Sequence, residues 1–141
     1  MERQKSRVLL VENDRDARRM YSDFLKADGC DVVEAPSGVE ALERLTNGEH
    51  FDIVVTDIMM ARMDGWELLK SIREDLGFDV LRLPVIVVSA HFDSDTLRVD
   101  ALGRGASAAY TKAEPLARLV HEVRVHTGRL RSKFDDDTNP D

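Results

Sequence analysis

The sequence predicts one α/β domain in which parallel strands alternate with helices. Five short apolar runs are separated by segments with helical periodicity. The runs are continuously apolar rather than alternating, which is typical of strands covered on both faces. Because parallel strands need crossover connections, we expect helices on both sides of a five-stranded sheet. The predicted strands are Val8–Val11, Val32–Val33, Ile53–Val55, Val85–Val88 and a weaker Ala108–Tyr110.

The first two predicted helices are bounded by capping residues. Asp14 is interpreted as the N-cap of the first helix or as a solvated side chain, and Gly29 is its stop signal. Ser37 and Glu40 have the spacing of a capping box that opens the second helix, which ends at Asn47–Gly48. The apolar faces are Ala17, Met20, Tyr21, Phe24 and Leu25 in the first helix, and Val39, Leu42 and Leu45 in the second.

The last three helices follow the third, fourth and fifth strands. Asp64 with Glu67 signals the start of the third helix by carboxylate capping. The fourth should begin near Asp93–Ser94, and the fifth has Pro115 near its first turn. The expected apolar faces are Trp66, Leu69, Ile72 and Leu76; Leu97, Ala101 and Leu102; and Leu116, Leu119, Val120 and Val123.

Composition limits the class of protein. The 141 residues suit a single domain, expected over residues 1–126, with a polar acidic tail at 127–141 that is expected to be mobile. The net charge is −7, but only −3 falls on residues 1–134, and no basic face for nucleic acid is expected. Cys30 is the single cysteine, and the apolar run near the N-terminus is too short for a signal peptide or a membrane span. These features predict a cytoplasmic protein.

Polar side chains follow four of the predicted strands. Asp57 ends a buried strand, and carboxylate can accept a phosphoryl group covalently, although an aspartate there can also simply begin a turn. Acids, a hydroxyl and a lysine at one sheet edge are the groups that metal-assisted phosphoryl transfer requires. The strand ends supply Glu12, Asn13 and Asp14; Asp57; Ser89; and Lys112.

From about Arg7 to His126 the chain resembles the receiver domains of two-component response regulators. The motifs that carry the resemblance are Val8–Asn13, Asp57–Gly65, Pro84–Ala90, and Gly105–Ala106 followed by Lys112, in that family's order and spacing. The resemblance implies a flavodoxin-like (CheY-like) doubly wound parallel sheet with strand order 2-1-3-4-5 and five helices.

The resemblance also implies a role for each residue of the site. Asp57 would take a phosphoryl group from a phosphohistidine on a histidine kinase or histidine phosphotransfer protein. Mg²⁺ would be held by Glu12, Asn13, Asp57 and the Met59 carbonyl, while Ser89 and Lys112 would contact the phosphoryl group. Phosphorylation would then remodel the face formed by the fourth helix, fifth strand and fifth helix, which would bind a downstream protein.

Two positions of the site depart from the family pattern. Asn13 stands where most relatives have a carboxylate. One charge at about 4 Å contributes up to roughly 4 kcal/mol at an effective dielectric constant of 20, so weaker Mg²⁺ binding is expected. Ala113 follows Lys112 where the family usually has a cis-proline. Because a cis bond before another residue costs about 2.5–4 kcal/mol, a different loop shape is expected.

The predicted fifth strand departs as well. The family's aromatic switch position falls on Ala109, and the neighbouring Tyr110 should face the opposite side of the sheet. The usual coupling between Ser89 and an aromatic ring is therefore expected to be absent or rewired. Ala61, in place of a common proline, is a lesser change.

The leading interpretation is a stand-alone receiver that signals by protein contact and is not an enzyme with a diffusible substrate. The alternative is a phosphorylation-independent adaptor with the same fold, motivated by Asn13, Ala109 and Ala113. A haloacid-dehalogenase-like phosphatase needs a second acid at position 59, which is Met59. A flavodoxin would need a phosphate-binding loop where the chain has Glu12–Asp14.

Overall fold

Five parallel strands form a single sheet in the order β2-β1-β3-β4-β5, as predicted. The computed structural model describes residues 5–90 and 94–128, without the side chain of Ser94. The prediction of a tail at 127–141 falls almost entirely outside these residues. The strands are β1 (Arg7–Val11), β2 (Asp31–Ala35), β3 (Ile53–Asp57), β4 (Val85–Ser89) and β5 (Ala108–Thr111).

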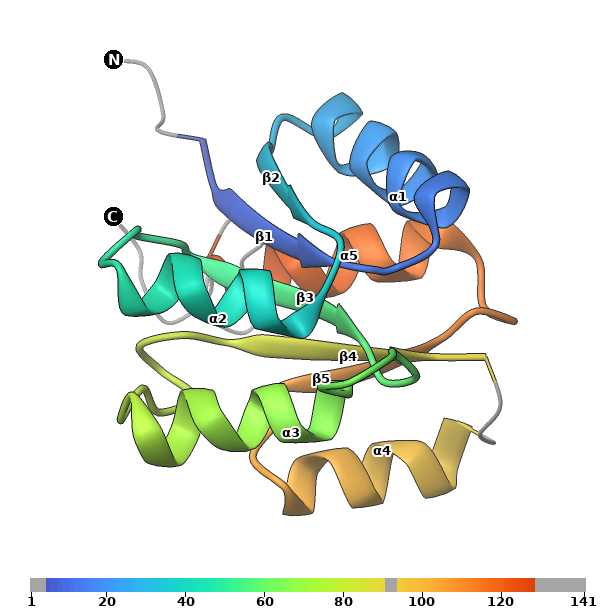
Figure 1. Cartoon of the computed structure of the whole chain (residues 1–141). Helices are drawn as coiled ribbons and strands as arrows, with labels where there is room; N and C mark the ends of the chain where they lie inside the picture. The colour runs from blue at the N-terminus through green and yellow to red at the C-terminus, as the bar shows by residue number, and fades with distance from the viewer. Residues whose placement is uncertain (1–4, 91–93, 129–141) are drawn as a thin grey trace, which may run out of the picture.

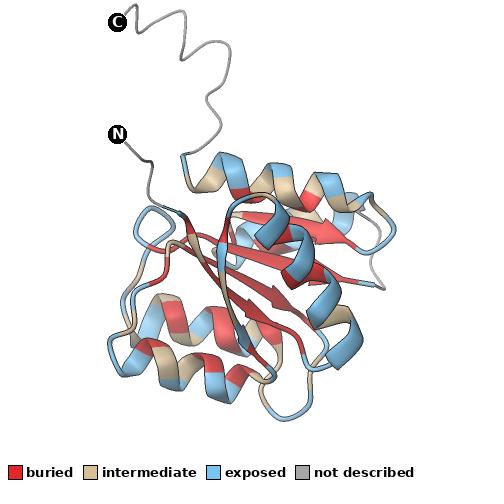
Figure 2. Cartoon of the chain, turned by 90° about the horizontal axis from the view of Figure 1, so that it is seen from above, coloured by how far each residue is buried: buried red, intermediate tan, exposed pale blue. Residues whose placement is uncertain are grey.

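Helices cover both faces of the sheet (Figure 1). Helices α2, α3 and α4 pack on one face, and α1 and α5 pack on the other. Strands β1, β3, β4 and β5 are buried along most of their length and β2 is only partly buried, whereas the outer sides of the helices are exposed (Figure 2). The bounds are α1 (Arg15–Ala27), α2 (Gly38–Thr46), α3 (Gly65–Lys70) with the π-helical turn η1 (Ser71–Asp75), α4 (Ser94–Gly103) and α5 (Leu116–His126).

Three predicted helix starts are confirmed by side-chain hydrogen bonds, whereas Pro115 makes none at the start of α5 and Asp93, predicted near the start of α4, lies outside the described residues. Asp14 accepts from the Ala17 N–H (2.9 Å), which establishes its N-cap role in α1. Ser37 accepts from the Glu40 N–H (3.1 Å) at the start of α2. A reciprocal capping box opens α3, in which Asp64 and Glu67 each accept from the backbone N–H of the other.

Some predicted apolar positions are exposed. Met20, Phe24, Val39 and Leu102 were placed on the apolar faces of their helices but are 43%, 47%, 40% and 54% exposed, so they lie outside the buried core. Tyr21 and Leu25 of α1, and Leu97 and Ala101 of α4, are buried as expected. Periodicity identifies the side of a helix that faces the sheet, but not how wide a stripe the sheet and neighbouring helices cover. Within the described residues, no helix is long and apolar enough to cross a bilayer.

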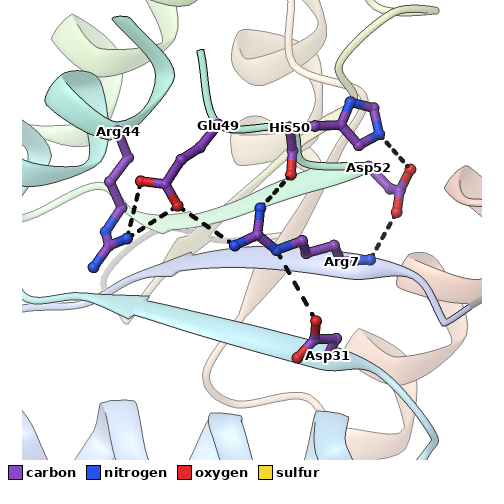
Figure 3. Close-up of polar contacts among 6 residues, drawn as sticks. All are labelled: Arg7, Asp31, Arg44, Glu49, His50 and Asp52. Carbon is purple, nitrogen blue, oxygen red and sulfur yellow. Dashed lines mark hydrogen bonds and ion pairs between the residues drawn. The ribbon is translucent and has the colours of Figure 1, made fainter. Parts of the chain in front are cut away.

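A cluster around Arg7 ties the starts of the strands together at the edge opposite their carboxyl ends (Figure 3). The Arg7 backbone N–H donates to Asp52 Oδ2 (2.7 Å), and its guanidinium donates to the His50 carbonyl (2.8 Å) and to Glu49 Oε1 (3.4 Å). The guanidinium also lies 4.7 Å from the centre of the Phe51 ring. β1 is thus fastened to the loop between α2 and β3.

Candidate functional site

The carboxyl ends of β1, β3, β4 and β5 bring the predicted polar residues to one edge of the sheet. Lys112 Nζ lies 3.3 Å from Glu12 Oε1 and 3.4 Å from Asp57 Oδ2. Glu12, Asp57 and Lys112, which lie far apart in the sequence, therefore meet at one point. Ser89 ends β4, and its neighbour Val88 is paired in register with Asp57.

Glu12 is held from several directions. Its second carboxylate oxygen, Oε2, accepts from the Asp14 N–H (3.0 Å), and Arg18 Nη1 donates to the Glu12 carbonyl (2.8 Å). The side chain is almost fully buried. Burial raises the pKa of Glu12, and the neighbouring carboxylate of Asp57 adds to this. Two carboxylates in contact in a buried place favour a nearby cation.

Lys112 supplies one such positive charge. Burial alone would lower the pKa of Lys112, but Asp57 and Glu12 together outweigh burial and raise it. The backbone N–H of Lys112 donates to the Ser89 carbonyl (2.8 Å), which fastens the lysine loop to the end of β4. The peptide between Lys112 and Ala113 is trans. Lys112 thus reaches the site with a trans bond to the alanine that follows it.

The other predicted metal-site residues contribute differently. Asn13 is exposed beside Glu12, and Met59 is 61% exposed. The carbonyl of Met59 stays its predicted ligand atom, because Mg²⁺ prefers oxygen to sulfur. Within the described residues, no three Asp, Glu, His or Cys side chains are grouped so as to hold a metal ion. Mg²⁺ needs only one or two carboxylates, with neutral oxygens completing its shell. The adjacent carboxylates of Glu12 and Asp57 fit that requirement.

The family model for the response regulator receiver domain matches residues 8–124. The chain belongs to this family. Receivers of response regulators act in two-component systems, generally depend on Mg²⁺ and generally take their phosphoryl group from a histidine kinase or phosphotransfer protein.

Two curated relatives illustrate the similarity of this receiver to longer proteins. Response regulator MprA of Mycobacterium sp. (strain KMS) is 36% identical over 135 residues, covering 96% of this chain and 54% of the relative. The CpxR homologue of Haemophilus influenzae is 31% identical over 134 residues, covering 95% and 56%. The receiver therefore spans about half the length of the curated relatives it matches.

Solved structures show the same fold. The receiver domain of Francisella response regulator 1452 is 27% identical, with a TM-score of 0.78, and 90% of this chain and 100% of that chain are covered. Vibrio cholerae CheY4 is 23% identical with a TM-score of 0.73, and 86% and 98% of the two chains are covered. The predicted CheY-like fold is confirmed.

The predicted departure on β5 is visible in the packing of this receiver. Ala109 packs with the core under α2, α3 and α4, and Tyr110 packs with the core under α1 and α5. The Tyr110 hydroxyl donates to the Glu114 carbonyl (2.7 Å). Tyr110 therefore points away from α4, as its sequence position predicted.

Two residues near the site make contacts that were not predicted from the sequence. Gly65 approaches the Asp57 backbone closely, and Glu114 folds back onto Thr111, the residue before Lys112. The aspartate–glycine pair after the third strand signals a turn, but not which backbone the glycine touches. An acid three residues after Thr111 is a local turn signal of the same kind as a helix cap, because its side chain accepts from a backbone N–H three residues away.

Proposed function

We propose that Asp57 accepts a phosphoryl group from a phosphohistidine on a histidine kinase or histidine phosphotransfer protein. One observation carries this proposal: the ammonium group of Lys112 lies within 3.4 Å of the buried Asp57 carboxylate and also contacts Glu12. The same edge of the sheet holds the hydroxyl-bearing residue Ser89. Open parallel sheets bind their ligands at this edge.

The chemistry is an in-line displacement at phosphorus. An oxygen of Asp57 attacks the phosphorus atom, the new P–O bond forms, and the P–N bond to the donor imidazole breaks. The imidazole leaves with the electron pair and takes a proton. Lys112 places a positive charge beside the phosphoryl oxygens, and the Ser89 hydroxyl is the proposed hydrogen-bond donor to one of them.

Magnesium fits the remaining groups. Glu12, Asp57, the Asn13 side-chain carbonyl and the Met59 backbone carbonyl would hold it. Bound there, Mg²⁺ would neutralise charge on the phosphoryl oxygens. Asn13 brings no charge, so we expect weaker metal binding than in a receiver with a carboxylate at that position.

The proposed output is a protein contact rather than turnover of a diffusible substrate. Phosphorylation changes the charge at one edge of the sheet, and the face of α4, β5 and α5 would bind the downstream partner. We expect no binding of nucleic acid or membrane by this domain, and we expect it to act in the cytoplasm. That the receiver acts as a stand-alone protein stays a prediction, because its relatives are about twice as long.

Intact mass spectrometry after incubation with acetyl phosphate and Mg²⁺ tests the proposal. The wild-type chain should gain one phosphoryl group, and Asp57→Asn should gain none. Asp64→Asn is the matched control, because asparagine caps a helix as well as aspartate does and the residue lies in the loop after β3. An unmodified wild-type chain, or equal modification of Asp57→Asn, would refute the phosphoacceptor role.

A phosphorylation-independent adaptor is the second candidate. Asn13 at the site and the small Ala109 on β5 favour it, since both remove features that phosphorylation-driven switching uses. The adaptor predicts no adduct on Asp57 and unchanged partner binding in Asp57→Asn. The phosphoacceptor predicts the opposite on both counts.

A further inference from the structure

The turn that follows β5 holds Lys112 between two residues that bind each other. The Glu114 N–H donates to the Thr111 carbonyl (3.0 Å), which closes the turn. In the reverse direction, Glu114 Oε2 accepts from the Thr111 N–H (2.9 Å) and from its hydroxyl (3.4 Å). The Glu114 side chain therefore fixes the shape of the turn in which Lys112 sits.

Glu114 also faces the two helices beside β5. Its Oε1 lies 3.7 Å from Arg118 Nη1 in α5 and 4.0 Å from Arg98 Nη2 in α4. The side chain of Glu114 is only 21% exposed, so solvent ions screen these pairs less than on the open surface. A single carboxylate thus joins β5, α4 and α5.

The side chain of β5 that faces α4 is small. Ala109 packs in one core cluster with Leu97 and Ala101 of α4, whereas Tyr110 lies in the cluster on the other face. An alanine methyl has no side-chain rotamer to change and no hydroxyl to donate. Movement at the end of β5 would therefore reach α4 through the polar turn rather than through an aromatic ring.

We propose that Glu114 is a positioning residue that fixes the position of Lys112. We propose too that it couples phosphorylation of Asp57 to a structural change in α4. The proposal rests on the phosphoacceptor function proposed for Asp57. A phosphoryl group on Asp57 adds negative charge where Lys112 now contacts two carboxylates, so the ammonium group moves towards the phosphoryl oxygens. The turn moves with Lys112 because its ends are hydrogen-bonded to each other, and Glu114 Oε1 then shifts relative to Arg98.

Three variants separate the two roles of Glu114. Glu114→Gln keeps an oxygen that accepts from Thr111 but removes the charge that faces Arg98 and Arg118. Glu114→Ala removes both. Glu122→Gln is the matched control, because Glu122 also pairs with Arg118 (3.3 Å) but does so from within α5. Circular dichroism confirms that each variant is folded before it is compared.

Amide hydrogen exchange and phosphorylation kinetics supply the readouts. Without phosphodonor, the Thr111 amide should exchange faster in Glu114→Ala, while Glu114→Gln and Glu122→Gln stay close to wild type. Phosphorylation by acetyl phosphate should slow by on the order of tenfold in Glu114→Ala, a loss typical of a supporting partner. With phosphodonor, the amides of residues 95–103 should change their exchange in wild type and Glu122→Gln, but not in Glu114→Gln.

Each half of the proposal can fail separately. Unchanged exchange of the Thr111 amide in Glu114→Ala would overturn the positioning role. If the amides of residues 95–103 change their exchange in Glu114→Gln as much as in wild type, the coupling is overturned. If the wild-type chain takes up no phosphoryl group, the proposed function fails and the coupling fails with it, whereas the Thr111 exchange still decides the positioning role.

Discussion

Gly65 packs against the backbone of Asp57. A Cβ atom at position 65 would overlap the Asp57 carbonyl oxygen and would lie 2.8 Å from Ile58 Cα. The Gly65 N–H donates to the Ile58 carbonyl (2.9 Å), so the start of α3 is hydrogen-bonded to the residue that follows β3. The position of the phosphoacceptor thus depends on the absence of a side chain eight residues later.

Replacing Gly65 by alanine should therefore displace the end of β3. We expect Gly65→Ala to lower the free energy of unfolding by about 1–3 kcal/mol, the usual range for overpacking, and to slow phosphorylation of Asp57. Urea denaturation and acetyl-phosphate kinetics measure the two effects. Gly103→Ala is the control, because a Cβ built there meets no described atom within 4 Å apart from its chain neighbours and the backbone of its own helix. Equal behaviour of the two variants would contradict this account.

Asn13→Asp should strengthen Mg²⁺ binding. A third carboxylate beside Glu12 and Asp57 would contribute up to roughly 4 kcal/mol to the binding free energy of Mg²⁺. Because Asn13 is exposed, solvent screens much of this contribution, and we expect a gain in affinity on the order of tenfold. Isothermal titration calorimetry measures it directly. Asn47→Asp adds the same charge after α2, at the opposite edge of the sheet, and should leave the affinity unchanged. An unaltered affinity in Asn13→Asp would mean that position 13 does not face the metal.

Arg73 joins two loops through backbone carbonyls. Its guanidinium donates to the carbonyls of Gly105 (2.9 Å), Phe78 (3.0 Å) and Leu83 (2.7 Å). A lysine carries one ammonium group and cannot reach these acceptors together. We expect Arg73→Lys to lower the free energy of unfolding by about 1.5–3 kcal/mol in urea denaturation.

The control for Arg73 is another arginine near the same loop. Arg82 is exposed and lies 5.3 Å from the centre of the Phe78 ring. Arg82→Lys should change the free energy of unfolding by no more than about 0.5 kcal/mol. If Arg73→Lys and Arg82→Lys lower the free energy of unfolding equally, the hydrogen bonds of Arg73 do not stabilise the fold as proposed.

Stability should fall in alkali because of Tyr21. Burial raises the pKa of Tyr21 from 10.0 to about 12, although the positive charge of Lys112 opposes the shift. Between pH of about 10 and 12 the unfolded chain loses the phenolic proton while the folded chain keeps it, so the free energy of unfolding decreases as pH rises. The full effect is up to roughly 2.7 kcal/mol, all of it present as stability below pH 10.

Tyr21→Phe removes this titration. Urea denaturation at about pH 8 and about pH 11 should show a smaller alkaline loss in the variant than in wild type. The comparison at the lower pH corrects for the lost hydroxyl itself, because Tyr21 is protonated there in both states. Identical alkaline losses in the two proteins would show that Tyr21 is not the group responsible.

The strand order was expected from the resemblance to receiver domains. The parallel sheet, the capped starts of α1, α2 and α3, and the meeting of Glu12, Asp57 and Lys112 were predictable from the residues themselves. Each follows from a local pattern combined with a general rule: continuous apolar runs make a covered parallel sheet, and the carboxyl ends of its strands meet at one edge. Asp14 and Asp64 were predictable as caps because a cap depends on residues three positions apart.

Contacts between distant segments were not predictable in the same way. The exposure of Phe24 and Leu102 depends on how much of each helix its neighbours cover, and the hydrogen bonds of Arg73 depend on where two loops come together. The π-helical turn η1 also departs from the continuous helix that the spacing of Leu69, Ile72 and Leu76 predicted. Tertiary packing overrides local preference at such places.

The anchoring of β1 by Arg7 has a practical consequence for how the protein can be handled. Because β1 begins at that anchor, a group attached close to the start of β1 would lie at the edge of the sheet remote from Asp57. A dye, a surface tether or a fused partner introduced there should leave the approach of a phosphodonor open, which suits immobilised measurements of transfer kinetics.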